Sequence, residues 1–111
     1  MGLDCFWVGE NDSKASVPGK FKICGGMFSG HGNDSFRGKV YNDVVESETG
    51  VSLYQEEIDS ETIKKMAETL GNIKWNSQFG FKYNIDSDEF TDLVRMFKAH
   101  ADEGHKIRGW W

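Results

Sequence analysis

The pattern of apolar positions predicts β-strands near both ends of the chain. The segment from Leu3 to Val8 is dense in aromatic and other β-favouring residues and stops at Gly9, which is typical of a strand. Polar and apolar residues alternate from Lys20 to Cys24 and again from Lys106 to Trp111. Because this alternation has the period of a half-buried strand, we expect two further strands there.

The first two of these strands are expected to pair antiparallel, joined by a polar loop that ends in the turn pair Pro18-Gly19. With Cys5 opposite Cys24, both thiols would lie on one face of the sheet and the opposite face would form the core. A slip of one residue would break this agreement. The residues expected on that core face are Phe6, Val8, Phe21 and Ile23.

Two helices carry clear start and stop signals in the second half of the chain. Asp59 is placed to cap the first helix, which Gly71 would close. Asp86 and Glu89 form a capping box for the second helix, which Gly104 would end. The stripes expected to face the core are Ile63, Met66, Ala67 and Leu70 in the first helix, and Phe90, Leu93, Val94, Phe97 and Ala101 in the second.

The segment 36–49 leaves the choice between helix and strand open. Its apolar spacing fits one helical face, with Asp34 or Ser35 as the cap and Gly50 at the end. An internal glycine and several valines weaken this helix. A strand over Lys39–Val45 therefore stays an alternative.

The aromatic segment from Ile73 to Tyr83 alternates only in part, and we expect an extended connection or a hairpin there. Together the elements predict the α+β class, with a small antiparallel sheet packed on one face by two or three helices. The length of 111 residues fits a single domain over residues 1–111.

Composition changes this picture mainly by exclusion. The formal net charge is −5, so direct binding of duplex nucleic acid by general positive charge is not expected. Two cysteines are too few for a disulfide-dense secreted scaffold. No window approaches the roughly 20 apolar residues of a membrane span, and the first residues lack the features of a signal peptide. We therefore expect a cytoplasmic protein with free thiols and no membrane partner.

The segment Gly25–Lys39 is the strongest candidate for a ligand site. A glycine-rich stretch between a strand and a helix start can hold an anion with backbone N–H groups and the helix dipole. The segment is neither a P-loop nor a dinucleotide-binding fingerprint, and its glycines can equally serve the geometry of a connecting loop. The residues expected to contact a phosphate or carboxylate are Gly25, Gly26, Ser29, Gly30, His31, Gly32, Asn33, Ser35, Arg37 and Lys39.

Trp110 and Trp111 stand side by side in the last expected strand. Alternation places them on opposite faces of that strand, so one would belong to the core and the other could cover a ligand or partner. We assign Trp110 to the ligand site, where its ring could stack on a base.

Other reactive residues form weaker patterns. Cys24 and His31 could make a nucleophile–base pair, which leaves a small Cys/His enzyme as a further alternative. His31, His100 and His105 lack the spacing of a zinc site, and Asp86–Glu89 lacks the glycine of a calcium loop. We expect no catalytic residue, no metal site and no cofactor.

Three short signatures resemble those of small uncharacterised proteins of bacteriophages and their bacterial hosts. They are the opening Met1-Gly2-Leu3-Asp4, the stretch Phe28-Ser29-Gly30-His31-Gly32-Asn33 and the ending Gly109-Trp110-Trp111. The resemblance implies a viral or mobile-element origin and action inside a bacterial host cell. It assigns no catalytic residues. Small proteins of this kind often act by binding, either inhibiting a host protein or sequestering a signalling nucleotide.

The leading hypothesis is a non-enzymatic binding protein, acting as a homo-oligomer, whose glycine-rich loop contacts an anionic small ligand such as a nucleotide. The alternative is an acidic protein that inhibits a host factor through its acidic and aromatic surface. The expected partner is accordingly an anionic small molecule or a host protein.

Overall fold

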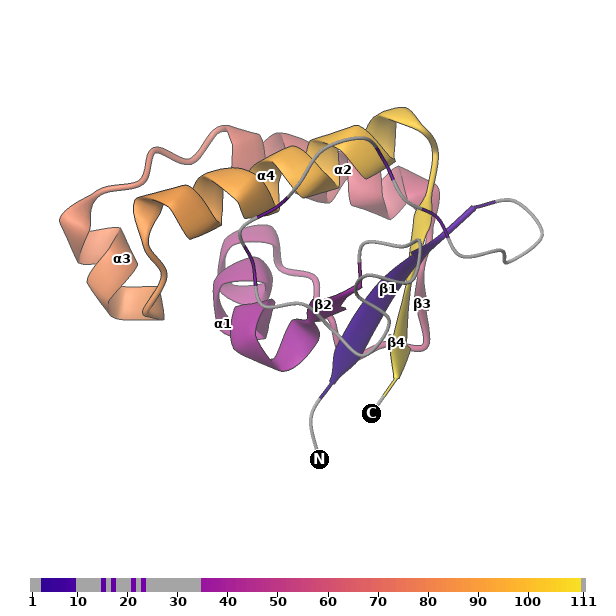
Figure 1. The fold of residues 1–111 in the computed structure, drawn as a ribbon, viewed down its shortest axis with the longest axis horizontal. Coiled ribbons are helices and arrows are strands. Elements are labelled where there is room, and N and C mark those ends of the chain that lie inside the picture. Colours follow the sequence, from indigo (N-terminus) through magenta and orange to yellow (C-terminus); the bar gives the residue numbers. More distant parts are fainter. Residues whose placement is uncertain are drawn as a thin grey trace.

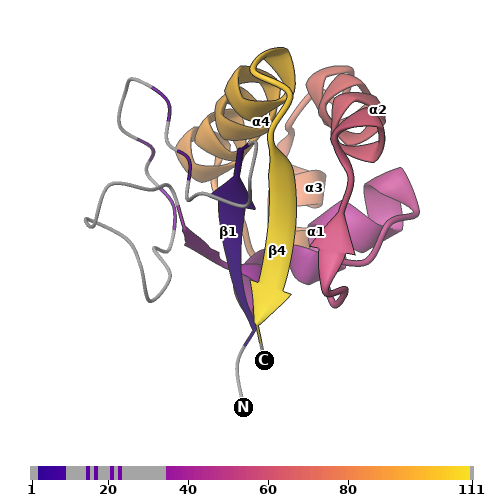
Figure 2. The same cartoon turned by 90° about the vertical axis from the view of Figure 1, so that its right-hand side faces the viewer.

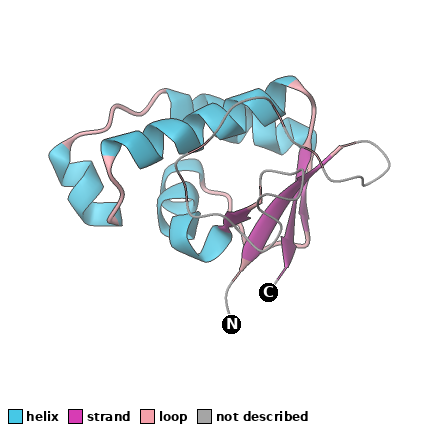
Figure 3. Cartoon of the chain, in the orientation of Figure 1, coloured by secondary structure: helices cyan, strands magenta, loops and turns pink. Residues whose placement is uncertain are grey.

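The structure, a computed structural model, describes residues 3–9, 15, 17, 21, 23 and 35–110. These residues form four strands and four helices (Figure 3). In chain order they are β1 (Asp4–Val8), β2 (Phe36–Arg37), α1 (Gly38–Thr49), β3 (Glu57–Ile58), α2 (Ser60–Gly71), α3 (Ser77–Tyr83), α4 (Ser87–Asp102) and β4 (Lys106–Trp110).

The strands form an antiparallel sheet of order β2-β1-β4-β3. The first and last strands predicted from the sequence therefore lie side by side at its centre (Figure 1). Seen with the sheet in front, α1, α2 and α4 lie behind it, while α3 lies further away, beyond the start of α4 (Figures 1 and 2). The predicted α+β class and the one-sided packing of helices on a small antiparallel sheet are confirmed.

The pairing of β1 differs from the expected one. Cys5 lies opposite Phe36 on one side and Gly109 on the other, so the expected pairing of Cys5 with Cys24 is wrong. Phe21 and Ile23 are not in strands, and they pack against the core as partly buried side chains. Cys24 and the other residues of that predicted strand lie outside the described residues.

The face of β1 that packs against the helices is not the expected one, although Val8 on the other face is buried as expected and Asp4 there is only 9% exposed. Leu3, Cys5 and Trp7 are fully buried, and Trp7 contacts the helices, with its ring stacked on His100 at a centroid distance of 4.1 Å. Phe6 points to the other face and is half-buried. Because apolar residues occupy both faces of this strand, alternation alone could not decide which face was inside.

Helix α1 settles the open choice over 36–49. The helix begins at Gly38, after the short strand that holds Phe36, and Arg37 is its N-cap without a side-chain capping bond. Gly38 lies so close to β1 that an added Cβ would come within 2.6 Å of the Cys5 sulfur. Gly50 ends the helix as expected, with a φ of 78° that favours glycine.

The two helices with clear capping signals form where the sequence places them. The Asp59 side chain accepts a hydrogen bond from the Thr62 amide at the start of α2. Asp86 does the same with the Glu89 amide at the start of α4. These bonds satisfy amides that have no partner within the helix. The buried stripe of α2 matches the expected one. In α4, Val94 is only partly buried, and Met96 and His100, which were not expected in the stripe, are fully buried.

The expected extended connection over Ile73–Tyr83 is wrong, because part of it forms the helix α3. The side chain of Asn76 accepts a hydrogen bond from the Phe79 amide and so caps the helix. Asn84 ends it in the left-handed conformation, with a φ of 52°. The aromatic residues of this segment fit partial alternation as well as helical spacing, so the capping asparagines are the signal that identifies the helix.

The core joins the sheet to α1, α2 and α4 around Trp7. Its ring meets Phe97 edge to face at a centroid distance of 5.2 Å and Phe36 at 6.1 Å. Aromatic pairs of this kind stabilise a fold in addition to the apolar area that they bury.

Among the described residues, none of the helices has both the length and the apolar character that a membrane span requires.

Candidate functional site

The face of the sheet turned away from the helices brings two of the expected site residues into one row. In the register, Asp4 lies opposite Arg37 in β2 and opposite Trp110 in β4. Residues directly opposite in an antiparallel pair share a face, so all three point to the same side. Adjacent strands are about 5 Å apart, so the backbones of Arg37 and Trp110 are separated by about 10 Å.

Arg37 is held in this row by an ion pair. Its Nε lies 3.6 Å from Oδ1 of Asp4, while its side chain stays 53% exposed. A guanidinium has five N–H donors, so one carboxylate contact leaves it able to bind a second anion. The exposed position means that the pair itself adds little to stability.

Trp110 ends β4 with 54% of its surface exposed. Trp110 therefore lies at the surface. Trp111 lies outside the described residues. A half-exposed indole on a sheet face offers a flat surface for stacking with a planar ligand.

A second row on the same face adds charge and a further ring. Phe6 lies opposite Arg108, and Arg108 lies opposite Glu57. Glu57 is 3.3 Å from the Lys106 Nζ and 3.8 Å from a terminal nitrogen of Arg108. Lys106 lies opposite Val8 in a third row on this face. Counted over the three rows, three of the five charged side chains are cationic, so this face is locally positive although the chain is acidic. Sequence reasoning missed Phe6, Arg108 and Lys106, because their shared face depends on which strands are neighbours.

The other expected ligand residues are divided between described and undescribed parts of the chain. Lys39 is exposed at the start of α1, and its amide donates to the Leu3 carbonyl at 3.3 Å. Ser35 was expected to donate a hydrogen bond to a ligand at the surface, but it is buried, with only 3% of its surface exposed. The residues Gly25, Gly26, Ser29, Gly30, His31, Gly32 and Asn33 lie outside the described residues.

Family models, curated proteins and solved structures contain no significant match to this chain. The chemistry of the site therefore has to be argued from its own residues.

His100 and His105 lie together as a hydrogen-bonded pair. Their Nδ1 atoms are 2.7 Å apart, which is a hydrogen bond in which one ring donates and the other accepts. His100 is fully buried against Trp7. No group of three potential metal-binding side chains occurs among the residues that the structure describes.

Cys5 is a free and buried thiol. Burial, with a smaller contribution from the Asp4 charge, raises the pKa of Cys5 to about 12. The reactive form of cysteine is the thiolate, so Cys5 is unsuited to nucleophilic catalysis at neutral pH. Cys24 and His31, the pair considered for an enzyme, lie outside the described residues.

Proposed function

We propose that this chain binds an anionic small molecule, such as a nucleotide, without transforming it. The single observation that carries the proposal is the row Arg37–Asp4–Trp110 on the outer face of the sheet. Arg37, expected to neutralise charge, and Trp110, expected to stack on a base, share a face with their backbones about 10 Å apart. A base stacked on Trp110 would leave its phosphate within reach of the long Arg37 side chain.

The neighbouring row supports the same ligand chemistry. Arg108 and Lys106 add positive charge on that face, and the half-buried Phe6 ring adds apolar surface beside it. Glu57 and Asp4 hold the cations in place through ion pairs. An incoming phosphate would compete with these carboxylates, so we expect moderate affinity that falls as salt is added.

The glycine-rich segment ends at the edge of this row, because Arg37 belongs to both. In the proposed complex, its glycines allow close approach of backbone amides, and Ser29, His31 and Asn33 add donors. Lys39 adds charge at the start of α1. Ser35 is left out of the proposed contacts because it is buried.

On the resemblance to phage and host proteins, we propose that the binding takes place in the cytoplasm of a bacterial cell. The ligand would then be sequestered by the protein, which would act as a homo-oligomer. The cellular location and the sequestering role rest on the resemblance, whereas the ligand chemistry rests on the sheet face.

Thermal unfolding with a panel of mononucleotides, dinucleotides and inorganic phosphate tests the proposal. A ligand at ten times its Kd stabilises the folded state by about 1.4 kcal/mol, which raises Tm by roughly 5 °C in a domain of this size. Arg37→Ala should abolish most of that shift. Arg95→Ala is the matched control, because Arg95 is also ion-paired and its side chain is 52% exposed.

Two results would contradict the proposal. One is the absence of any stabilisation by the panel at millimolar concentration. The other is an equal response of the Arg37→Ala and Arg95→Ala proteins to the ligand.

A further inference from the structure

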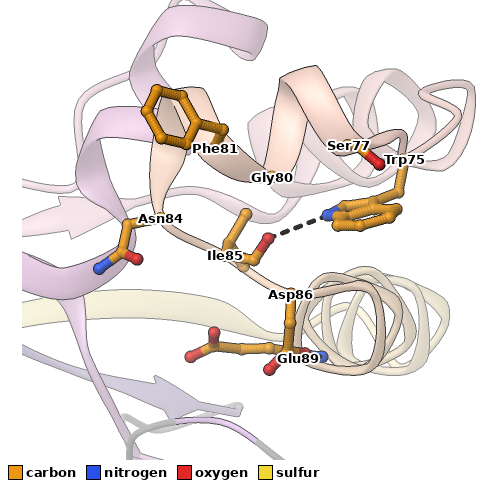
Figure 4. A pocket seen from close by; sticks show the side chains of 8 residues that line it. All are labelled: Trp75, Ser77, Gly80, Phe81, Asn84, Ile85, Asp86 and Glu89. Atoms are coloured by element: carbon orange, nitrogen blue, oxygen red, sulfur yellow. Dashed lines mark hydrogen bonds between the residues drawn. The ribbon is translucent and has the colours of Figure 1, made fainter.

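A hollow lies between α3 and the start of α4, far along the chain from the residues of the sheet face (Figure 4). Its volume is about 480 Å³, within the range of ligand-binding clefts. The residues used below are Trp75, Gly80, Phe81, Ile85, Asp86 and Glu89, which all line it. No residue of the sheet rows takes part.

The apolar part of the hollow is fixed by the backbone. The indole nitrogen of Trp75 donates to the Ile85 carbonyl at 2.9 Å (Figure 4). The Trp75 ring lies so close to Gly80 that an added Cβ would overlap it. Ile85 is buried. A ring anchored by a hydrogen bond and a close glycine keeps its position before any partner arrives, which lowers the cost of binding.

Phe81 stands at the edge of this hollow with 91% of its surface exposed. In Figure 4 its ring projects from α3 on the side away from Trp75. Burial of a phenylalanine ring contributes about 1.5–3 kcal/mol, so leaving it in solvent forgoes a large gain. Exposed aromatic side chains beside a pocket are typical anchors of protein interfaces.

The opposite edge of the hollow is acidic. Asp86 and Glu89 both belong to the start of α4, and the Tyr41 hydroxyl donates to Oε2 of Glu89 at 2.6 Å. This bond orients the Glu89 carboxylate, and Asp86 is held by its capping bond to the Glu89 amide. Two oriented carboxylates that line the same hollow as the Trp75 ring suit a cation with an apolar stem, as offered by lysine or arginine.

We propose that this hollow is the docking site for a basic segment of a partner protein, in which an arginine or lysine side chain lies beside an apolar residue. The stem of the basic side chain packs on Trp75, its charged head pairs with Glu89 and Asp86, and the apolar neighbour covers Phe81. Charge complementarity selects this occupant, because a nucleotide or an acidic segment would meet two carboxylates. The proposal does not depend on the anion site of the sheet.

Titration of the isotope-labelled protein with a short blocked peptide of alternating arginine and leucine tests this site by NMR. The matched peptide has glutamate in place of arginine. The basic peptide should shift the signals of the Trp75 indole, Phe81 and Glu89, and the acidic peptide should not. Phe81→Ala should weaken peptide binding about tenfold.

The double variant D86N/E89Q should weaken binding by at least the same factor, while asparagine and glutamine keep the capping and tyrosine hydrogen bonds. Asp88→Asn is the charge control, since Asp88 is exposed in the same helical turn but does not line the hollow. Tyr54→Ala is the control for loss of an exposed ring.

The proposal is overturned if the basic peptide shifts signals elsewhere, or if the controls weaken binding as much as the hollow variants. It is also overturned if sedimentation shows that Phe81→Ala dissociates an oligomer, because the occupant would then be a second copy of this chain. Equal binding of both peptides would exclude charge as the basis of recognition.

Discussion

Two surfaces of this protein combine aromatic rings with charged side chains, and they carry opposite charge. On the outer sheet face, Trp110 lies with Arg37 and Arg108 on the same side. In the hollow between α3 and α4, Trp75 faces the acidic start of α4. The net charge of −5 is therefore the sum over regions of opposite sign that would attract different partners.

The two surfaces are also built in different ways. The sheet face joins residues far apart in the sequence, and only the pairing of strands brings them together. The hollow is local, since residues 75–89 supply all its lining. Changes at one surface should consequently leave the other intact, and this independence is what the following predictions test.

The largest expected effect comes from filling the two closest backbone approaches. Gly80→Ala places a methyl group against the Trp75 ring and 2.8 Å from the Ile85 carbonyl oxygen. Gly38→Ala places one 2.6 Å from both the Cys5 sulfur and a Leu3 methyl carbon. Overpacking of this kind costs about 1–3 kcal/mol, so urea denaturation should show each variant destabilised by that amount.

Binding assays on the folded fraction of each variant should distinguish the sheet face from the hollow. Gly80→Ala should lose the basic peptide and keep the nucleotide response, because Trp75 is displaced. Gly38→Ala should do the reverse, because the close contact of α1 with β1 is disturbed beside Arg37. Equal losses in both assays would show that the surfaces are coupled through the core.

The contrast also explains which parts of the fold the sequence could predict. The helices α2 and α4 have their caps, stripes and ends encoded within short windows, as Asp59 and Asp86 show. Strand β4 alternates clearly between polar and apolar residues, and its side chain Ile107 is fully buried. Local signals of this kind need no knowledge of distant residues.

Long-range pairing could not be read in the same way. The sequence does not show which face of β1 meets the helices, because Phe6 and Val8 are as apolar as Cys5 and Trp7 and both faces bury residues. The strand's partners Phe36 and Gly109 are also distant in the sequence. For the same reason, Arg37 and Trp110 were each named as site residues without any basis for placing them together. The hollow was missed because the asparagine caps of α3 were not recognised, so its residues were not seen as a cluster.

Exchange of single aromatic residues gives the next largest effect. Trp110→Ala should weaken nucleotide binding about tenfold, since stacking on a base contributes about 1–3 kcal/mol, and it should leave peptide binding unchanged. Phe81→Ala should show the opposite pattern. Calorimetric titration of both proteins with both ligands gives the four values needed. Adding salt should weaken both interactions in the unsubstituted protein, because each depends on charge.

If Trp110→Ala and Phe81→Ala each weaken both ligands, the exposed rings stabilise the fold in a general way and recognise nothing. That result would remove the stated basis of the sheet site and of the hollow alike. Stability of both variants is therefore measured alongside binding.

The smallest expected effect concerns Asp59, which belongs to neither surface. Its hydrogen bond from the Thr62 amide, with smaller help from Lys65 and Lys106, lowers the pKa of Asp59 below its usual value of 3.8. A group with a lower pKa in the folded state binds protons more readily when unfolded, so its contribution is complete above that usual value. It is lost as pH falls through the folded-state pKa. Asp59→Asn keeps the capping geometry but cannot titrate, so the Tm of the unsubstituted protein should fall relative to this variant in acid. As a control, the nucleotide and the basic peptide should bind equally well to Asp59→Asn and to the unsubstituted protein at neutral pH. A difference in Tm between the two proteins that does not change with pH would contradict the prediction, because the hydrogen bond from Thr62 would then not favour the charged carboxylate.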